Sequence, residues 1–123
     1  MKIDQNSIKP IYLQIAEGIE DDILNGLLRA EEQAYSQYQI ARQFNVNPAT
    51  AAKGINLLVN EGILCKKRGL SMHVTVNARE TIREKRRKLF VSEFFSNFMD
   101  QALKLNLTRE DLKKMIDNHA GGA

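Results

Sequence analysis

The side chains best suited to chemistry in this sequence are cations, whose natural partner is phosphate. The run KKRG at 66–69 lies in a stretch, 63–78, that holds no acidic residue. A second basic stretch, 79–88, holds six bases and two acids, whereas residues 1–32 hold three bases and seven acids. Local clustering matters more to a polyanion than the net charge of +3. The clusters indicate a nucleic-acid partner, although such a run can also be a solvated helix face.

The sequence offers few residues for a disulfide, a metal site or catalysis. Cys65 is the single cysteine, so neither an internal disulfide nor a cysteine-rich zinc site is expected. His73 and His119 lie far apart and offer no metal-binding spacing. No paired nucleophile and base and no phosphate loop is visible. The sequence predicts a protein that is not an enzyme and holds no metal or cofactor. It shows neither a signal core nor an apolar run of about 20 residues, so we expect no membrane span and a cytoplasmic location.

Three helices are predicted ahead of the basic run. The first covers about 10–25, with isoleucines at i+4 spacing between Pro10 and Gly26. A capping-box pattern, SxxQ, opens the second at about 36–44, and the pair NP opens the third at about 48–61. Three residues join the second and third helices, as in a helix-turn-helix, although an ordinary helical hairpin has the same pattern.

Two short strands, Ile63–Cys65 and His73–Val76, are predicted on either side of the basic run. A cationic hairpin directly after a helix-turn-helix is the wing of a winged-helix domain. Its cations can neutralise phosphates or enter the minor groove. The alternative is a solvated hairpin whose charges protect a sheet edge.

A long helix over about 78–105 carries four of the five phenylalanines, and Thr108 caps a final helix. Two such helices cannot bury so much apolar surface alone. We expect an interface between two copies, with an intrachain core as the alternative. The predicted dimerisation residues are Phe90, Phe94, Phe95, Phe98, Ala102, Leu112, Met115 and Ile116.

The predicted fold class is mainly α (α+β). It comprises a winged helix-turn-helix domain over 1–77, a two-helix dimerisation region over 78–120 and a disordered tail over 121–123. A ligand pocket of about 300–1,000 Å³ does not fit within so small a hairpin, so no effector is expected inside one subunit's tail. A site between subunits is left open.

Several segments together resemble the GntR family of bacterial regulators. They are PIYLQIAEGIEDDILNG at 10–26, residues 36–41, NVNPATAAKGINLLVNEGIL at 45–64 and KKRG at 66–69. The form NPATAAK is similar to the YtrA-type subfamily. The resemblance implies a homodimeric winged-helix repressor or regulator that binds double-stranded DNA at a pseudo-palindromic operator. Such regulators often control transporter operons.

The resemblance and the basic hairpin together predict a DNA-binding set. Its members are Ser36, Gln37, Tyr38, Asn47, Ala49, Thr50, Lys53, Lys66, Lys67, Arg68 and Gly69. Gln37 and Tyr38 replace the family's usual Glu-Arg pair, and Ser71 replaces the second wing glycine. The change at Tyr38 removes an arginine, the commonest strong base reader, from the predicted helix-turn-helix. The operator would then be read through other groups and DNA shape, or the DNA affinity is weak. The alternative function is a winged-helix protein-interaction module with weak or no DNA binding.

Overall fold

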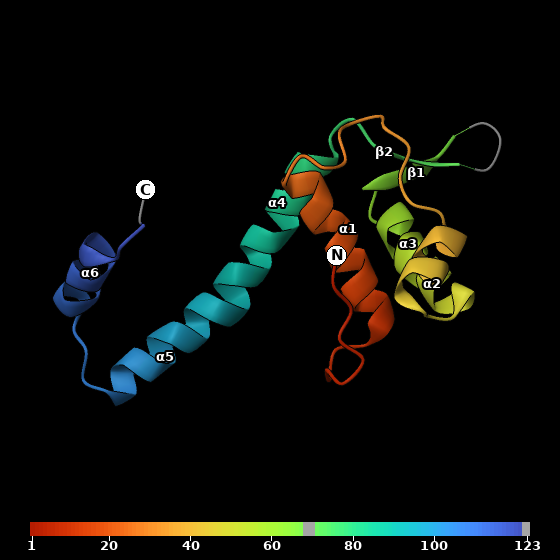
Figure 1. Ribbon diagram of the computed structural model, residues 1–123. Coiled ribbons are helices and arrows are strands. Elements are labelled where there is room, and N and C mark those ends of the chain that lie inside the picture. Colours follow the sequence, from red (N-terminus) through yellow and green to blue (C-terminus); the bar gives the residue numbers. More distant parts are fainter. Residues whose placement is uncertain (68–70, 122–123) are drawn as a thin grey trace. The chain divides into compact units, whose positions relative to one another are not determined.

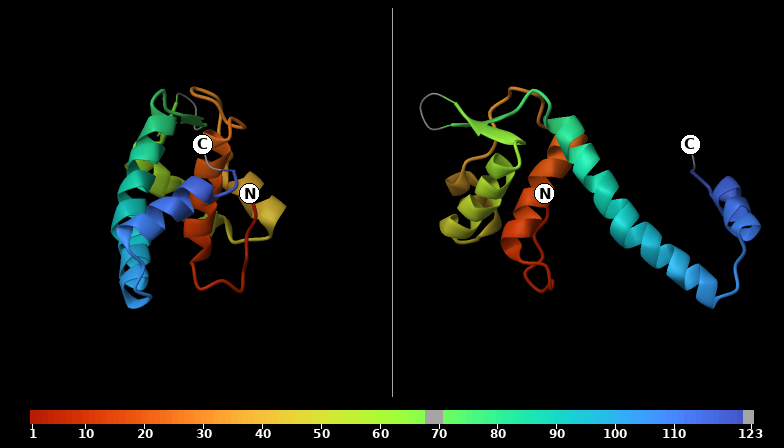
Figure 2. Two further views of the ribbon diagram at one scale, coloured as in Figure 1. Left: turned by 90° about the vertical axis from the view of Figure 1, so that its left-hand side faces the viewer. Right: turned by 180° about the vertical axis from the view of Figure 1, so that it is seen from behind.

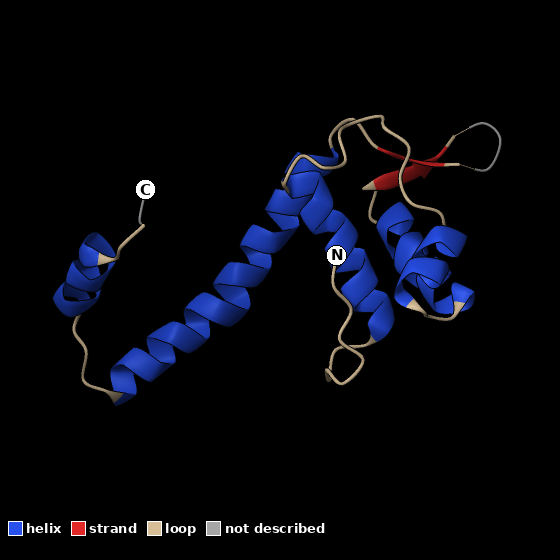
Figure 3. Cartoon of the chain, in the orientation of Figure 1, coloured by secondary structure: helices blue, strands red, loops and turns tan. Residues whose placement is uncertain are grey.

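The protein is mainly helical with one small antiparallel sheet, as Figure 1 shows for the computed structural model. The structure describes residues 1–67 and 71–121. Its elements are α1 (Ile11–Leu24), α2 (Gln37–Phe44), α3 (Pro48–Asn60), β1 (Leu64–Lys66), β2 (Met72–Val74), α4 (Ala78–Leu89), η1 (Phe90–Phe95), α5 (Ser96–Lys104) and α6 (Arg109–Asn118). Figure 3 separates the helices from the two strands by colour. The predicted winged-helix fold class is confirmed.

The contacts divide the chain into two compact units, Met1–Glu84 and Lys85–Ala123. The first unit holds α1 to α3, both strands and the start of α4. The second holds the rest of α4, η1, α5 and α6. The predicted tail residues Gly122 and Ala123 lie outside the described part of the chain.

Local capping explains where α2 and α3 begin. The Ser36 hydroxyl accepts a hydrogen bond from the Gln39 backbone N–H at 3.1 Å, and the Gln39 side chain accepts one from the Ser36 N–H at 2.8 Å. Asn45 ends α2 in the left-handed conformation (φ 52°), which asparagine tolerates better than most residues. Asn47 then caps α3 through the Ala49 N–H at 2.8 Å. The predicted three-residue corner is therefore confirmed.

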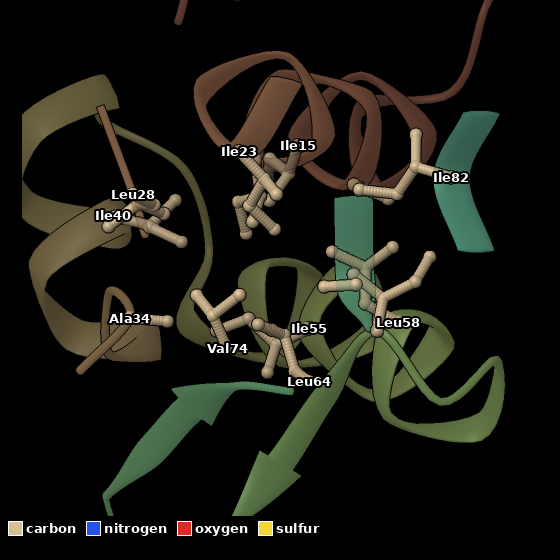
Figure 4. Packing of buried hydrophobic residues seen from close by; sticks show 14 of the residues in the cluster. Ile15, Ile23, Leu28, Ala34, Ile40, Ile55, Leu58, Leu64, Val74 and Ile82 are labelled. Atoms are coloured by element: carbon tan, nitrogen blue, oxygen red, sulfur yellow. The ribbon is translucent and has the colours of Figure 1, made fainter. Parts of the chain in front are cut away.

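The core of the first unit lies where α3 packs against both α1 and α2. Figure 4 shows Ile15 and Ile23 of α1 facing Ile55 of α3 and Val74 of β2. Each fully buried isoleucine or leucine contributes about 1.5–3 kcal/mol relative to exposure. Ile82 is also buried in this cluster, so the first turns of α4 belong to the core of the winged domain.

Gly54 permits the close packing of α3 on α1. A Cβ atom at this position would lie 2.7 Å from the backbone carbonyl oxygen of Tyr12 and 3.1 Å from the Ile15 side chain. Glycine costs about 1 kcal/mol relative to alanine inside a helix. The close approach that it allows offsets this cost.

The sheet pairs Leu64 with Val74 and Lys66 with Met72. Both strands are three residues long and differ by one or two positions from the predicted ranges. Thr75, predicted within the second strand, follows β2; its backbone N–H donates to the Ile63 carbonyl oxygen at 3.1 Å and its hydroxyl donates to the Gly62 carbonyl oxygen at 2.8 Å. Residues 31–34, which lie between the first two helices, add main-chain hydrogen bonds to β2, including Ala34 N–H to the Met72 carbonyl oxygen.

In the second unit, the predicted long helix contains a π-helical segment, η1. The backbone there follows the wider π pattern, and the Ser96 hydroxyl donates to the Val91 carbonyl oxygen at 3.1 Å. After α5, Thr108 and Asp111 form a second capping box that opens α6. The sequence predicted this cap and the helix, but not the π segment.

Candidate nucleic-acid interface

The predicted DNA-binding residues on α2 and α3 are accessible in the winged domain, whose elements Figure 2 shows from two further sides. Tyr38 is 63 % exposed. Ser36, Asn47, Ala49 and Lys53 are also exposed, and Gln37 and Thr50 are half-buried. The α2–α3 corner therefore presents its predicted surface outward rather than into the core.

Three of the predicted residues meet on one open hollow of about 670 Å³. It is lined by Gln37 of α2, by Ala49 and Lys53 of α3, and by further residues that the sequence did not single out: Tyr12, Ala52, Asn56, Leu57 and Asn60. Because Ala49 and Ala52 have short side chains, the surface of α3 is shallow at this position. Asn56 and Asn60 could have been found from the sequence, since they follow Lys53 at helical spacing on the polar face of α3.

Capping consumes part of the hydrogen-bonding capacity of this surface. The Asn47 side-chain oxygen accepts from Ala49, and the Asn47 carbonyl oxygen accepts from the N–H groups of Thr50 and Ala51. The backbone donors at the start of α3 are thus engaged within the domain. The Ser36 hydroxyl accepts one bond and keeps its own O–H as a donor. Anions at this corner must therefore be bound mainly by side chains.

Lys53 is held by an aromatic ring that the sequence analysis missed. Its Nζ lies 4.1 Å from the centroid of the Tyr12 ring on α1. Cations within about 6 Å of a ring centroid are attracted to the negative face of the ring. No local pattern pairs these residues, because their contact depends on how α1 crosses α3.

The wing brings further cations to the same domain. Lys66 and Lys67 are exposed. The Lys67 N–H donates to the Ser71 carbonyl oxygen at 3.0 Å, next to the last residue pair of the β1–β2 sheet. Arg68 and Gly69, the predicted wing tip, lie outside the described residues. On β2, the His73 Nδ1 atom is buried without a hydrogen-bond partner among the described residues.

The predicted dimerisation residues fall into two groups. Phe90, Phe94, Phe95, Phe98, Met115 and Ile116 are exposed, whereas Ala102 and Leu112 are buried within the single chain. Phe94 is 69 % exposed, and its ring centroid lies 6.2 Å from that of Phe90. Large exposed apolar patches are typical of interaction surfaces, so the dimerisation assignment of the exposed group stays a prediction.

These features define a winged helix-turn-helix domain. Its α3 helix exposes one face to solvent, and its hairpin carries cations. The chain belongs to the family described as bacterial regulatory proteins, gntR family, whose model matches residues 11–74. The family resemblance seen in the sequence is therefore confirmed.

Named relatives support the assignment to the YtrA-type subfamily. The chain is 28 % identical over 123 residues to the HTH-type transcriptional repressor YtrA of Bacillus subtilis, covering 99 % of this chain and 81 % of YtrA. It is 35 % identical over 75 residues to the repressor NagR of the same organism, covering 61 % of this chain but only 31 % of NagR. The likeness to NagR therefore concerns less than a third of that protein.

Solved structures agree in fold. YtrA from Sulfolobus acidocaldarius, a GntR-family transcription factor, superimposes with a TM-score of 0.59 at 29 % identity, covering 95 % of this chain and 93 % of that one. BusR of S. agalactiae, in complex with its busAB-promotor DNA, gives a TM-score of 0.57 at 26 % identity, covering 90 % of this chain and 55 % of BusR. Within residues 1–67 and 71–121, no helix is long and apolar enough to cross a membrane.

Proposed function

We propose that this chain is a homodimeric transcriptional repressor that binds a pseudo-palindromic operator. The outward face of α3, beside the hollow that Lys53 and Gln37 line, carries the proposal. A major groove about 12 Å wide admits an α-helix, and the first residues of a recognition helix make the base contacts. Repression is proposed because the relatives YtrA and NagR bear that name.

The interface would combine base reading by α3 with phosphate contacts around it. Lys53 is the one long cation of α3 and can donate to the acceptors of guanine. Ser36, the N-cap of α2, and Tyr38 within α2 would donate to phosphate, and Lys66 and Lys67 would do so from the wing. Because α3 carries no arginine, DNA shape supplies a larger share of specificity.

The apolar surface of the second unit supports the proposed homodimer. Phenylalanines 45–69 % exposed on a single chain leave a large unsatisfied area, which a second copy would cover. A two-fold dimer addresses half-sites about one helical turn, near 10 base pairs, apart. The regulated genes would include a transporter operon, as the family resemblance implies.

The test is selection of a binding site from a random-sequence duplex library, followed by a salt series. We expect an inverted repeat to be recovered. The two described wing lysines of each protomer suggest about four phosphate contacts, so affinity should fall about a hundred-fold between about 50 and 200 mM salt.

A matched pair of variants assigns this salt response to the wing. The variant K66A/K67A should weaken binding to all sequences and flatten the salt slope. The control K113A/K114A makes the same charge change on exposed residues of α6 and should leave the slope unaltered. A flat response in the wild type, or one stoichiometric protein partner that DNA does not displace, would contradict the proposed function.

A further inference from the structure

The ammonium group of Lys53 is placed by α1, not by its own helix alone. Its Nζ lies 4.1 Å from the centroid of the Tyr12 ring, and both side chains line the hollow beside α3. Lys53 is exposed and Tyr12 is half-buried, so the ring has a supported position while the ammonium group reaches solvent.

The backbone fixes this pairing. Gly54, next to Lys53, brings α3 so close to α1 that a Cβ atom there would lie 2.7 Å from the Tyr12 carbonyl oxygen. The main chain at Tyr12 is therefore set by direct contact with the recognition helix. Since the contact is between backbones, the ring and the lysine stem start from fixed positions.

A contact with an aromatic face leaves a cation able to bind a second partner. The ring attracts the charge through its quadrupole, while the three N–H donors of the ammonium group can still reach oxygen or nitrogen acceptors. A flexible lysine loses rotamer entropy when a ligand fixes it. A lysine already ordered against a ring loses less of that entropy on binding, which is the usual gain from preorganisation.

We propose that Tyr12 is a positioning residue of the DNA interface, whose ring holds Lys53 in the direction from which it binds DNA. The proposal rests on the proposed DNA-binding function. It extends the interface beyond the helix-turn-helix and the wing to a third element, the first turn of α1.

The experiment is a double-mutant cycle measured by fluorescence anisotropy on the duplex that the wild-type protein selects. The variants are Y12L, which removes the ring but keeps apolar bulk, K53A, and Y12L/K53A. Y12F keeps the ring and serves as the conservative control. Thermal unfolding of each variant checks that the winged domain stays folded.

We expect Y12L to weaken binding about two- to five-fold in the wild-type background, the range of an exposed cation–π contact. In the K53A background the same change should have no effect, and Y12F should bind as the wild type does. A purely structural role of Tyr12 would weaken binding equally in both backgrounds.

Three results would overturn the inference. The first is that Y12L binds as tightly as the wild type, or more tightly. The Tyr12 ring would then contribute nothing to binding, or would hold Lys53 away from DNA. An equal loss with and without Lys53 would mean that Tyr12 acts independently, and a loss in Y12F would assign the effect to the hydroxyl group. In each case the wild type still binds its duplex; if it selects no sequence at all, the proposed function itself fails.

Discussion

At the scale of single residues, the least expected feature is a buried carboxylate held by a tyrosine. The Tyr35 hydroxyl donates to Asp22 Oδ2 at 2.6 Å, and Asp22 is only 7 % exposed. The bond joins the C-terminal half of α1 to the segment that leads into α2. It therefore helps to position the helix-turn-helix against the first helix.

The variant Y35F should lower the free energy of unfolding by about 1–3 kcal/mol, because it leaves a buried acceptor without its donor. The measurement is chemical denaturation at neutral pH. Y38F, which removes a hydroxyl from an exposed tyrosine, is the matched control and should change stability little. Equal effects of the two substitutions would refute the role of the Tyr35–Asp22 bond.

The same bond predicts a dependence on alkaline pH. Burial, then the hydrogen bond to Asp22 and its charge, raises the pKa of Tyr35 from 10.0 to about 12. The folded state thus binds the phenolic proton more tightly than the unfolded state does. The resulting stabilisation is complete below pH 10 and is lost as the pH rises from 10 to about 12. The stability difference between the wild type and Y35F should shrink over that range, and a constant difference would contradict the assignment.

At the scale of elements, two glycines inside helices allow a test of how α3 meets α1. Gly54→Ala should destabilise the fold by about 1–3 kcal/mol through overpacking, although alanine is the better helix former. The reason is that the new Cβ meets backbone at Tyr12.

The matched control is Gly18→Ala, because the three atoms nearest to its new Cβ belong to the Met1 side chain and not to the backbone. That change should be neutral or stabilising, by up to about 1 kcal/mol. Denaturation midpoints of both variants provide the comparison. A Gly54→Ala protein as stable as Gly18→Ala would show that the helices can separate without cost.

The π segment η1 changes how the phenylalanines of the long helix are arranged around its axis. Residues four apart drift by about 40° per step around an α-helix. The phenylalanines at 90, 94 and 98 would therefore spread around a regular helix. A π turn takes more residues than an α turn, so the π segment over Phe90–Phe95 opposes this drift between Phe90 and Phe94.

At the scale of the whole molecule, DNA binding and assembly should be coupled. Phe94→Asp places a charge where a second copy would cover an exposed ring, so the protein should become monomeric and bind its operator more weakly. Ser92→Asp adds the same charge at a neighbouring exposed polar position and should stay dimeric. Light scattering and anisotropy on the selected duplex check both properties, and a dimeric Phe94→Asp protein would contradict the proposed interface.

Much of the winged domain was determined by the sequence alone, because its signals are local. The Ser36 and Asn47 caps, the Pro48 start and the isoleucine spacing each act within a few residues, so helix bounds were predicted to within about one residue. The exposure of the α3 surface followed from the same periodicity. The family motifs, being contiguous, were also readable without coordinates.

Only the tertiary structure revealed the contacts between segments distant in sequence. The Tyr12 ring beneath Lys53, the Asp22–Tyr35 bond and the addition of residues 31–34 to β2 all join such segments. Helical periodicity gives the face on which a side chain lies, but not which residue of another helix it meets. That depends on the crossing of α1 and α3, which the missing side chain of Gly54 permits.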